Sequence, residues 1–134
     1  MGNQVKKIKF TVTTILSATP EQVYNSWLST TGHSRMTGAE SKANKKINGL
    51  FSAWDGYISG INIELEDNKR ILQKWRTSEF KQTEEDSLLE IILVEDAQGT
   101  KLTLYHSNLP ANGMQYQQGW QDNYFTPMNE YFAE

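Results

Sequence analysis

Apolar and polar residues alternate along several stretches of the chain, and this alternation predicts β-strands. In residues 8–16, IKFTVTTIL, one parity holds mostly apolar residues and the other begins with polar ones, as in a half-buried strand. The first set is Ile8, Phe10, Val12, Thr14 and Leu16, and the second includes Lys9, Thr11 and Thr13. Similar alternation covers residues 57–65, 71–77, 87–95 and 100–106. Asp55-Gly56, flanked by apolar residues, indicates a two-residue hairpin turn, because both positions then need positive φ. The middle of the chain is therefore predicted to form an antiparallel sheet.

The segment after the first strand predicts a capped helix. Thr19 can cap it, Pro20 suits its first turn, and Gln22 stands three positions after Thr19, as a capping box requires. Bulky apolar residues then recur at one-turn spacing over residues 23–28. Residues 29–41 are polar and contain glycine, so they are interpreted as a short second helix or a loop.

The last segment, from about residue 114, predicts a long helix with an aromatic face. Tyr116, Trp120, Tyr124 and Met128 follow one another at steps of four. Pro127 has no N–H and crowds the preceding turn, so we expect a kink that would cost about 3 kcal/mol without compensating packing.

The order of the elements predicts the fold class. A strand, a helical segment, a run of antiparallel strands and one long helix indicate an α+β fold, in which the helices gather on one side of a sheet. A chain of 134 residues fits one domain, predicted over residues 1–134.

Composition excludes several classes of function. The chain has no cysteine, which removes disulfides, thiolate nucleophiles and cysteine-ligated metals. The net charge of -3 argues against an extended nucleic-acid footprint. No apolar run approaches the ~18 residues of a membrane span, and no leader pattern is visible, so we expect no membrane insertion and a cytoplasmic location.

Four motifs together resemble one known family. NGLFSAWDGYISG, NKRILQKWR, GTKLTLYHSNLP and QQGWQDNYFTPMNEYF are similar, in order and spacing, to the activator of the ninety-kilodalton heat-shock chaperone ATPase. The resemblance covers roughly residues 9–132 and is to the activator's carboxy-terminal domain and its single-domain bacterial relatives, within the START-like (SRPBCC) superfamily. It implies the helix-grip fold, a bent antiparallel sheet wrapped around the carboxy-terminal helix, with a cavity between them in many relatives. It also implies a chaperone or other protein as a partner, in the setting of a stress response.

Polar residues on predicted core-facing positions mark a candidate cavity. His106 shares its parity with Leu104, and Gln73 shares its parity with Trp75. Buried polar groups need hydrogen-bond partners, and a few of them among aromatic residues are typical of a pocket for a small hydrophobic ligand. The aromatic residues could equally just fill the core. The candidate cavity consists of Ile61, Ile63, Gln73, Trp75, Leu104, His106, Trp120 and Tyr124.

Catalytic and metal-binding signals are weak. No nucleophile elbow, phosphate loop or dinucleotide fingerprint occurs, and His33 has no second ligand at helical or strand spacing. We therefore predict no catalytic residue, no metal and no cofactor. Three hypotheses remain: a non-enzymatic module that docks on a protein, a carrier or sensor of a small hydrophobic ligand, and an enzyme with His106 as its base.

Overall fold

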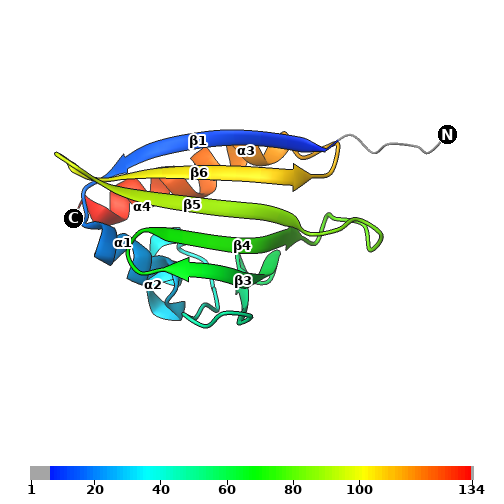
Figure 1. Cartoon of the computed structure of the whole chain (residues 1–134), viewed down its shortest axis with the longest axis horizontal. Coiled ribbons are helices and arrows are strands. Elements are labelled where there is room, and N and C mark those ends of the chain that lie inside the picture. Colours follow the sequence, from blue (N-terminus) through cyan, green and yellow to red (C-terminus); the bar gives the residue numbers. More distant parts are fainter. Residues whose placement is uncertain (1–6, 134) are drawn as a thin grey trace.

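A computed structural model describes residues 7–133. Six antiparallel strands form one curved sheet, in the order β1-β6-β5-β4-β3-β2 (Figure 1). The first and last strands in this order are thus β1 and β2, and β6 pairs with both β1 and β5. The strands are β1 (Ile8–Leu16), β2 (Leu50–Ala53), β3 (Ile58–Glu66), β4 (Arg70–Thr77), β5 (Ser87–Asp96) and β6 (Gly99–Leu109).

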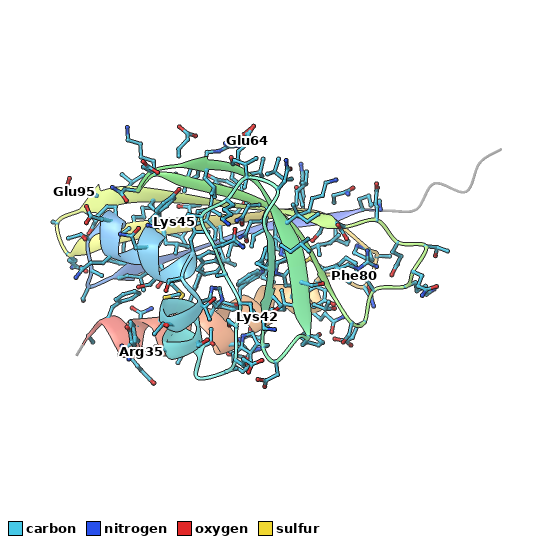
Figure 2. The ribbon with its side chains drawn as sticks, turned by 90° about the horizontal axis from the view of Figure 1, so that it is seen from below. Arg35, Lys42, Lys45, Glu64, Phe80 and Glu95 are labelled. Carbon is cyan, nitrogen blue, oxygen red and sulfur yellow. The ribbon has the colours of Figure 1, made fainter. Side chains whose placement is uncertain are left out.

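The helices lie on one side of the sheet, as the α+β prediction requires. Figure 2 shows them beneath the strands, with Glu64 on the opposite side. Helix α1 (Pro20–Trp27) begins with the predicted capping box, in which Thr19 Oγ1 accepts from the Gln22 N–H at 3.1 Å. The Thr19 N–H in turn donates to Gln22 Oε1 at 2.9 Å. The ambiguous segment after it forms helix α2 (Thr30–Thr37).

The predicted hairpin turn is also present. Asp55 and Gly56 have φ of 58° and 91°, and the N–H of Tyr57 donates to the Trp54 carbonyl at 3.0 Å. The turn therefore holds Trp54 and Tyr57 side by side at the tip of the β2–β3 hairpin.

The carboxy-terminal helix packs its aromatic face against the concave side of the sheet, which is the helix-grip arrangement. It runs as α3 (Gln115–Trp120), a π-helical turn η1 (Gln121–Phe125) and α4 (Thr126–Phe132). The four residues of the predicted stripe are all buried, together with Phe125. Pro127 stands in the first turn of α4, where its missing N–H is tolerated. The π-helical turn thus takes up the disruption that was expected as a kink.

The predicted facing of strand β3 is wrong over its first half. Asn62 is fully buried, while its neighbours Ile61 and Ile63 are only partly buried, and Ile61 pairs with exposed Lys74. The register shifts between Asn62 and Glu64, so a bulge at this point reverses the parity along the strand. The core side of β3 therefore carries an amide where Ile61 and Ile63 were expected.

A network of amide hydrogen bonds explains why an asparagine is tolerated there. Asn62 Oδ1 accepts from Gln73 Nε2 at 2.8 Å, which supplies the partner expected for Gln73. Asn62 Nδ2 donates to the carbonyls of Asn44 and Lys46 at 3.0 and 3.1 Å. The pair therefore ties the loop before β2 to the middle of the sheet.

Within residues 7–133, no helix is long and apolar enough to cross a membrane.

We predict that Asn62→Ala lowers the free energy of unfolding by about 3 kcal/mol, since it leaves Gln73 and two loop carbonyls without their partner. Urea unfolding followed by fluorescence measures the change. Ile61→Ala on the same strand is the matched control and should cost less than half as much, because Ile61 faces outward. If Ile61→Ala lowers the free energy of unfolding more than Asn62→Ala does, Ile61 faces the core, as the sequence predicted.

Candidate functional site

An open cavity of about 230 Å³ lies between the tip of the β2–β3 hairpin and the carboxy-terminal helix. Trp54, Tyr57 and Ile58 come from the hairpin, and Trp75 comes from β4. The helix contributes Tyr116, Gly119, Trp120, Asn123 and Tyr124. The volume is below the roughly 300–1,000 Å³ of sites for drug-sized ligands, so the cavity suits a smaller molecule.

The helix residues of the cavity follow one regular face. Positions 116, 119, 120, 123 and 124 are spaced i, i+3, i+4, i+7 and i+8, which is a single stripe on a helix. Gly119 interrupts this stripe of large side chains. A Cβ at Gly119 would meet only Asn123 Nδ2, at 3.8 Å. The missing side chain therefore leaves open the space that the aromatic residues surround.

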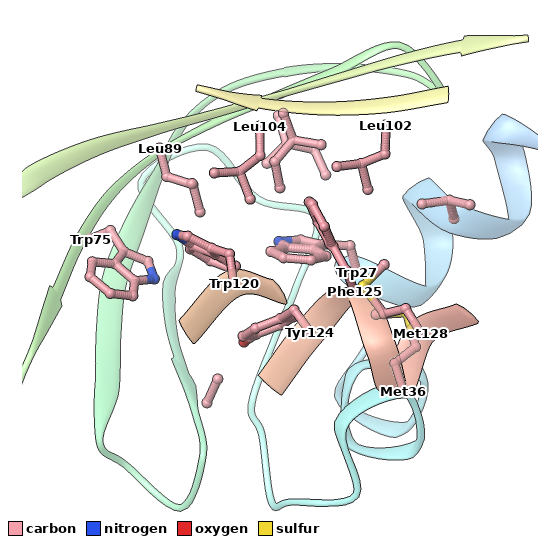
Figure 3. Close-up of a cluster of buried hydrophobic side chains, with 14 of the residues drawn as sticks. Trp27, Met36, Trp75, Leu89, Leu102, Leu104, Trp120, Tyr124, Phe125 and Met128 are labelled. Carbon is pink, nitrogen blue, oxygen red and sulfur yellow. The ribbon is translucent and has the colours of Figure 1, made fainter. Parts of the chain in front are cut away.

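Trp120 is held by a buried chain of hydrogen bonds that reaches the sheet. Its indole N–H donates to His106 Nδ1 at 2.9 Å, so the other ring nitrogen of neutral His106 carries the proton. His106 Nε2 donates to Ser87 Oγ at 2.8 Å, and Ser87 donates to the carbonyl of Trp75 at 2.7 Å. Figure 3 shows Trp120 and Tyr124 rising from the helix beside Trp75 on β4. The chain of bonds thus links two walls of the cavity.

The other histidine holds Tyr124. His33 is buried, its Nδ1 donates to the carbonyl of Trp27 at 2.9 Å, and its Nε2 accepts from the Tyr124 hydroxyl at 2.8 Å. Burial lowers the pKa of His33 to about 4 and the pKa of His106 to about 3. Both rings are therefore neutral near pH 7, with both nitrogens hydrogen-bonded.

The remaining tyrosines of the cavity are also bonded. The Tyr116 hydroxyl and Thr77 Oγ1 are 2.6 Å apart, and the Tyr57 hydroxyl donates to exposed Glu79. Burial, followed by the hydrogen bond to Glu79, raises the pKa of Tyr57 above its usual value. Burial also raises the pKa of Tyr116, and the charge of Glu79 adds to this.

The sequence-predicted residues fall into three groups. Trp75, Trp120 and Tyr124 line the cavity. Gln73, Leu104 and His106 are buried but do not line it; Gln73 is bonded to Asn62, and His106 is bonded to Trp120 behind the cavity wall. Ile61 and Ile63 stand on β3 away from the lining residues, for the reason given above.

Several lining residues were not predicted as cavity residues, namely Trp54, Tyr57, Ile58, Tyr116, Gly119 and Asn123. Two signals in the sequence point to most of them. The Asp55-Gly56 turn brings Trp54 and Tyr57 together, and the helix stripe contains Tyr116 with a glycine among its aromatic residues.

Among residues 7–133 no cluster of His, Asp and Glu has the arrangement of a metal site.

Comparison with known proteins identifies the family. The family described as activator of Hsp90 ATPase homolog 1-like protein matches residues 17–133. The chain belongs to this family. Its curved sheet and carboxy-terminal helix form the helix-grip arrangement that the resemblance implied. No curated protein sequence matches the chain.

Solved structures of the same fold are distant in sequence. An HSP90 activator from Plasmodium falciparum has a TM-score of 0.75 and 22% identity, over 90% of this chain and 91% of that one. A Chromobacterium violaceum protein has a TM-score of 0.75 and 20% identity, over 94% and 97% of the two chains. CalU16 from Micromonospora echinospora has a TM-score of 0.72 and 21% identity, over 96% and 77%. Such low identity supports the fold alone.

The two buried histidines predict a loss of stability in mild acid. Their pKa values lie below the unfolded value of about 6.5, so from pH 6.5 down to about 4 the unfolded chain binds more protons. Stability is therefore full above pH 6.5 and falls with pH, by about 4 kcal/mol between pH 7.5 and 5 for both groups together.

Urea unfolding at pH 7.5, 6 and 5 measures this dependence. His33→Gln removes one of the two groups and should halve the change with pH, whatever its effect at pH 7.5. An unfolding free energy that stays constant from pH 7.5 to 5 would show that the histidines are not buried as neutral rings.

Proposed function

We propose that this protein is a non-enzymatic binding module whose cavity carries or senses a small hydrophobic ligand. The observation that supports this most is the open aromatic cavity between hairpin and helix, with walls held by hydrogen bonds on their far sides. A preformed apolar pocket with a few polar groups is the usual form of a small-molecule site.

The chemistry of the lining favours binding over catalysis. His106 does not line the cavity, and both of its nitrogens are engaged with Trp120 and Ser87. The tyrosine hydroxyls of the cavity have raised pKa values, so they remain protonated near pH 7. A general base within reach of a bound molecule is needed for proton abstraction, and the lining supplies no such group.

We predict that Gly119→Phe abolishes ligand binding, because the new ring would occupy the cavity from a position where a Cβ meets only Asn123 Nδ2, at 3.8 Å. Native mass spectrometry of protein purified from its own host detects a ligand that co-purifies. Titration with toluene, followed by the NMR shifts of the indole N–H groups, measures the access of a small apolar probe.

Gly119→Ala is the matched control. It leaves most of the cavity open and should raise the unfolding free energy by about 1 kcal/mol, because alanine is the better helix former. Binding of toluene by Gly119→Phe with unchanged affinity, or no binding by the parent protein, would contradict the ligand site.

A second candidate function is docking on a chaperone of the ninety-kilodalton class. The family description and the relative described as an HSP90 activator support it. The loop before β2 and the first residue of β2 offer a surface for a partner, since Ile47 and Leu50 are 53% and 72% exposed and Lys45 and Lys46 are exposed as well. Figure 2 shows Lys42 and Lys45 on this loop.

Charge reversal tests the docking surface. We expect the double change Lys45→Glu and Lys46→Glu to weaken binding to the host's chaperone at least tenfold and to leave toluene binding unchanged. NMR titration of the labelled protein with the chaperone gives both the affinity and the residues that shift. Lys101→Glu on strand β6 is the control. If this control loses as much affinity for the chaperone, the loop before β2 is not the docking surface.

A further inference from the structure

Most polar tips of the cavity residues are already occupied, and the indole N–H of Trp54 is the buried exception among the described lining residues. This limits what the cavity can bind. Tyr116 is bonded to Thr77, Tyr124 to His33 and Tyr57 to Glu79, as described above. The indole N–H of Trp120 is bonded to His106. A ligand that enters therefore meets mainly aromatic rings. A ligand that brings its own N–H or O–H groups would lose hydrogen bonds to water there and regain few.

The cavity has a carboxylate bonded to one of its walls and no positive charge among its lining residues. None of the described residues that line it is Lys, Arg or His. The exposed carboxylate of Glu79 accepts a hydrogen bond from the hydroxyl of Tyr57, which is a lining residue. A negative charge next to one wall favours a cation over an anion there.

The rings stand at large angles to one another. Trp75 and Tyr116 have ring centroids 5.1 Å apart and an interplanar angle of 82°. Trp120 and Tyr124 are 4.7 Å apart at 47°. Trp54 and Tyr57 face this group from the hairpin, on the other side of the cavity. Rings set around a space in this way can present π faces from several directions, as a site for a cation without N–H groups requires.

We propose that the cavity selects a small quaternary ammonium cation over neutral molecules of the same shape. The alkyl groups of such a cation fill apolar space and need no hydrogen bond, while its charge interacts with the rings and the carboxylate of Glu79. This inference names the ligand class for the site in the proposed function and rests on that function.

A matched pair of probes tests the selection. Choline and 3,3-dimethyl-1-butanol have nearly the same shape, and only choline carries the charge. We expect choline to bind about tenfold more tightly, from the strength of cation–π contacts in a partly desolvated site. Titration followed by indole NMR shifts should move Trp54, Trp75 and Trp120. Trp27 does not line the cavity and serves as the internal reference.

Two variants separate the effect of the Glu79 charge on binding from the effect of the cavity volume. Glu79→Gln should weaken choline several-fold and leave dimethylbutanol unchanged, because it removes charge and keeps the shape. Gly119→Phe should abolish binding of both probes. The proposal is supported only by this combination of results.

The failure of this inference is distinguishable from the failure of the proposed function. If dimethylbutanol or toluene binds as tightly as choline, and Gly119→Phe blocks them, the ligand site stands and the preference for a cation is wrong. If no probe shifts the three lining tryptophans, both the site and the preference are wrong.

Discussion

The structure depends on burying the polar tips of a helix that is aromatic along its inner face. Tyrosine and tryptophan bring large apolar bodies to a core, but each also brings a hydroxyl or an N–H that is costly to bury without a partner. Here the successive stripe residues Tyr116, Trp120 and Tyr124 each have one, in Thr77, His106 and His33. The helix is therefore fixed in rotation and in register against the sheet and α2.

This constraint explains the chemistry of the two histidines. A neutral imidazole can accept on one nitrogen and donate on the other, so it can bridge a donor on the helix and an acceptor elsewhere. His106 bridges Trp120 to Ser87 and His33 bridges Tyr124 to the carbonyl of Trp27. The same bonds prevent either ring from acting as a free base. Because the bonds lie behind the cavity walls, they hold the rings of Trp120 and Tyr124 in fixed positions along the cavity.

Local periodicity was enough to predict the fold class, the capped first helix, the hairpin turn and the stripe on the last helix. The facing of β3 could not be predicted this way, because Ile61 and Ile63 are the more apolar set and only a bulge and a loop partner make Asn62 the buried one. The role of His33 depends on Tyr124, 91 positions away, and no local pattern reports such a contact. Parity and spacing put Trp75, Trp120 and Tyr124 on the core side, where they are buried, whereas the space beside Gly119 depends on a side chain that glycine lacks.

Pro127 and Gly119 lie on either side of the π-helical turn of the last helix, and each affects the shape of the cavity. Pro127 cannot donate to the carbonyl of Asn123, and the helix widens to a π-helical turn over Gln121–Phe125 before α4 begins. Asn123 and Tyr124 of the cavity belong to that turn, and Gly119 lies one residue before Trp120, where α3 ends. Widened turns of this kind are frequent at functional sites, since they change which side chains share a face. A bulky residue at position 119 would occupy space that the aromatic residues now surround, so the open cavity depends on this glycine as well as on the path that the helix takes through the π-helical turn.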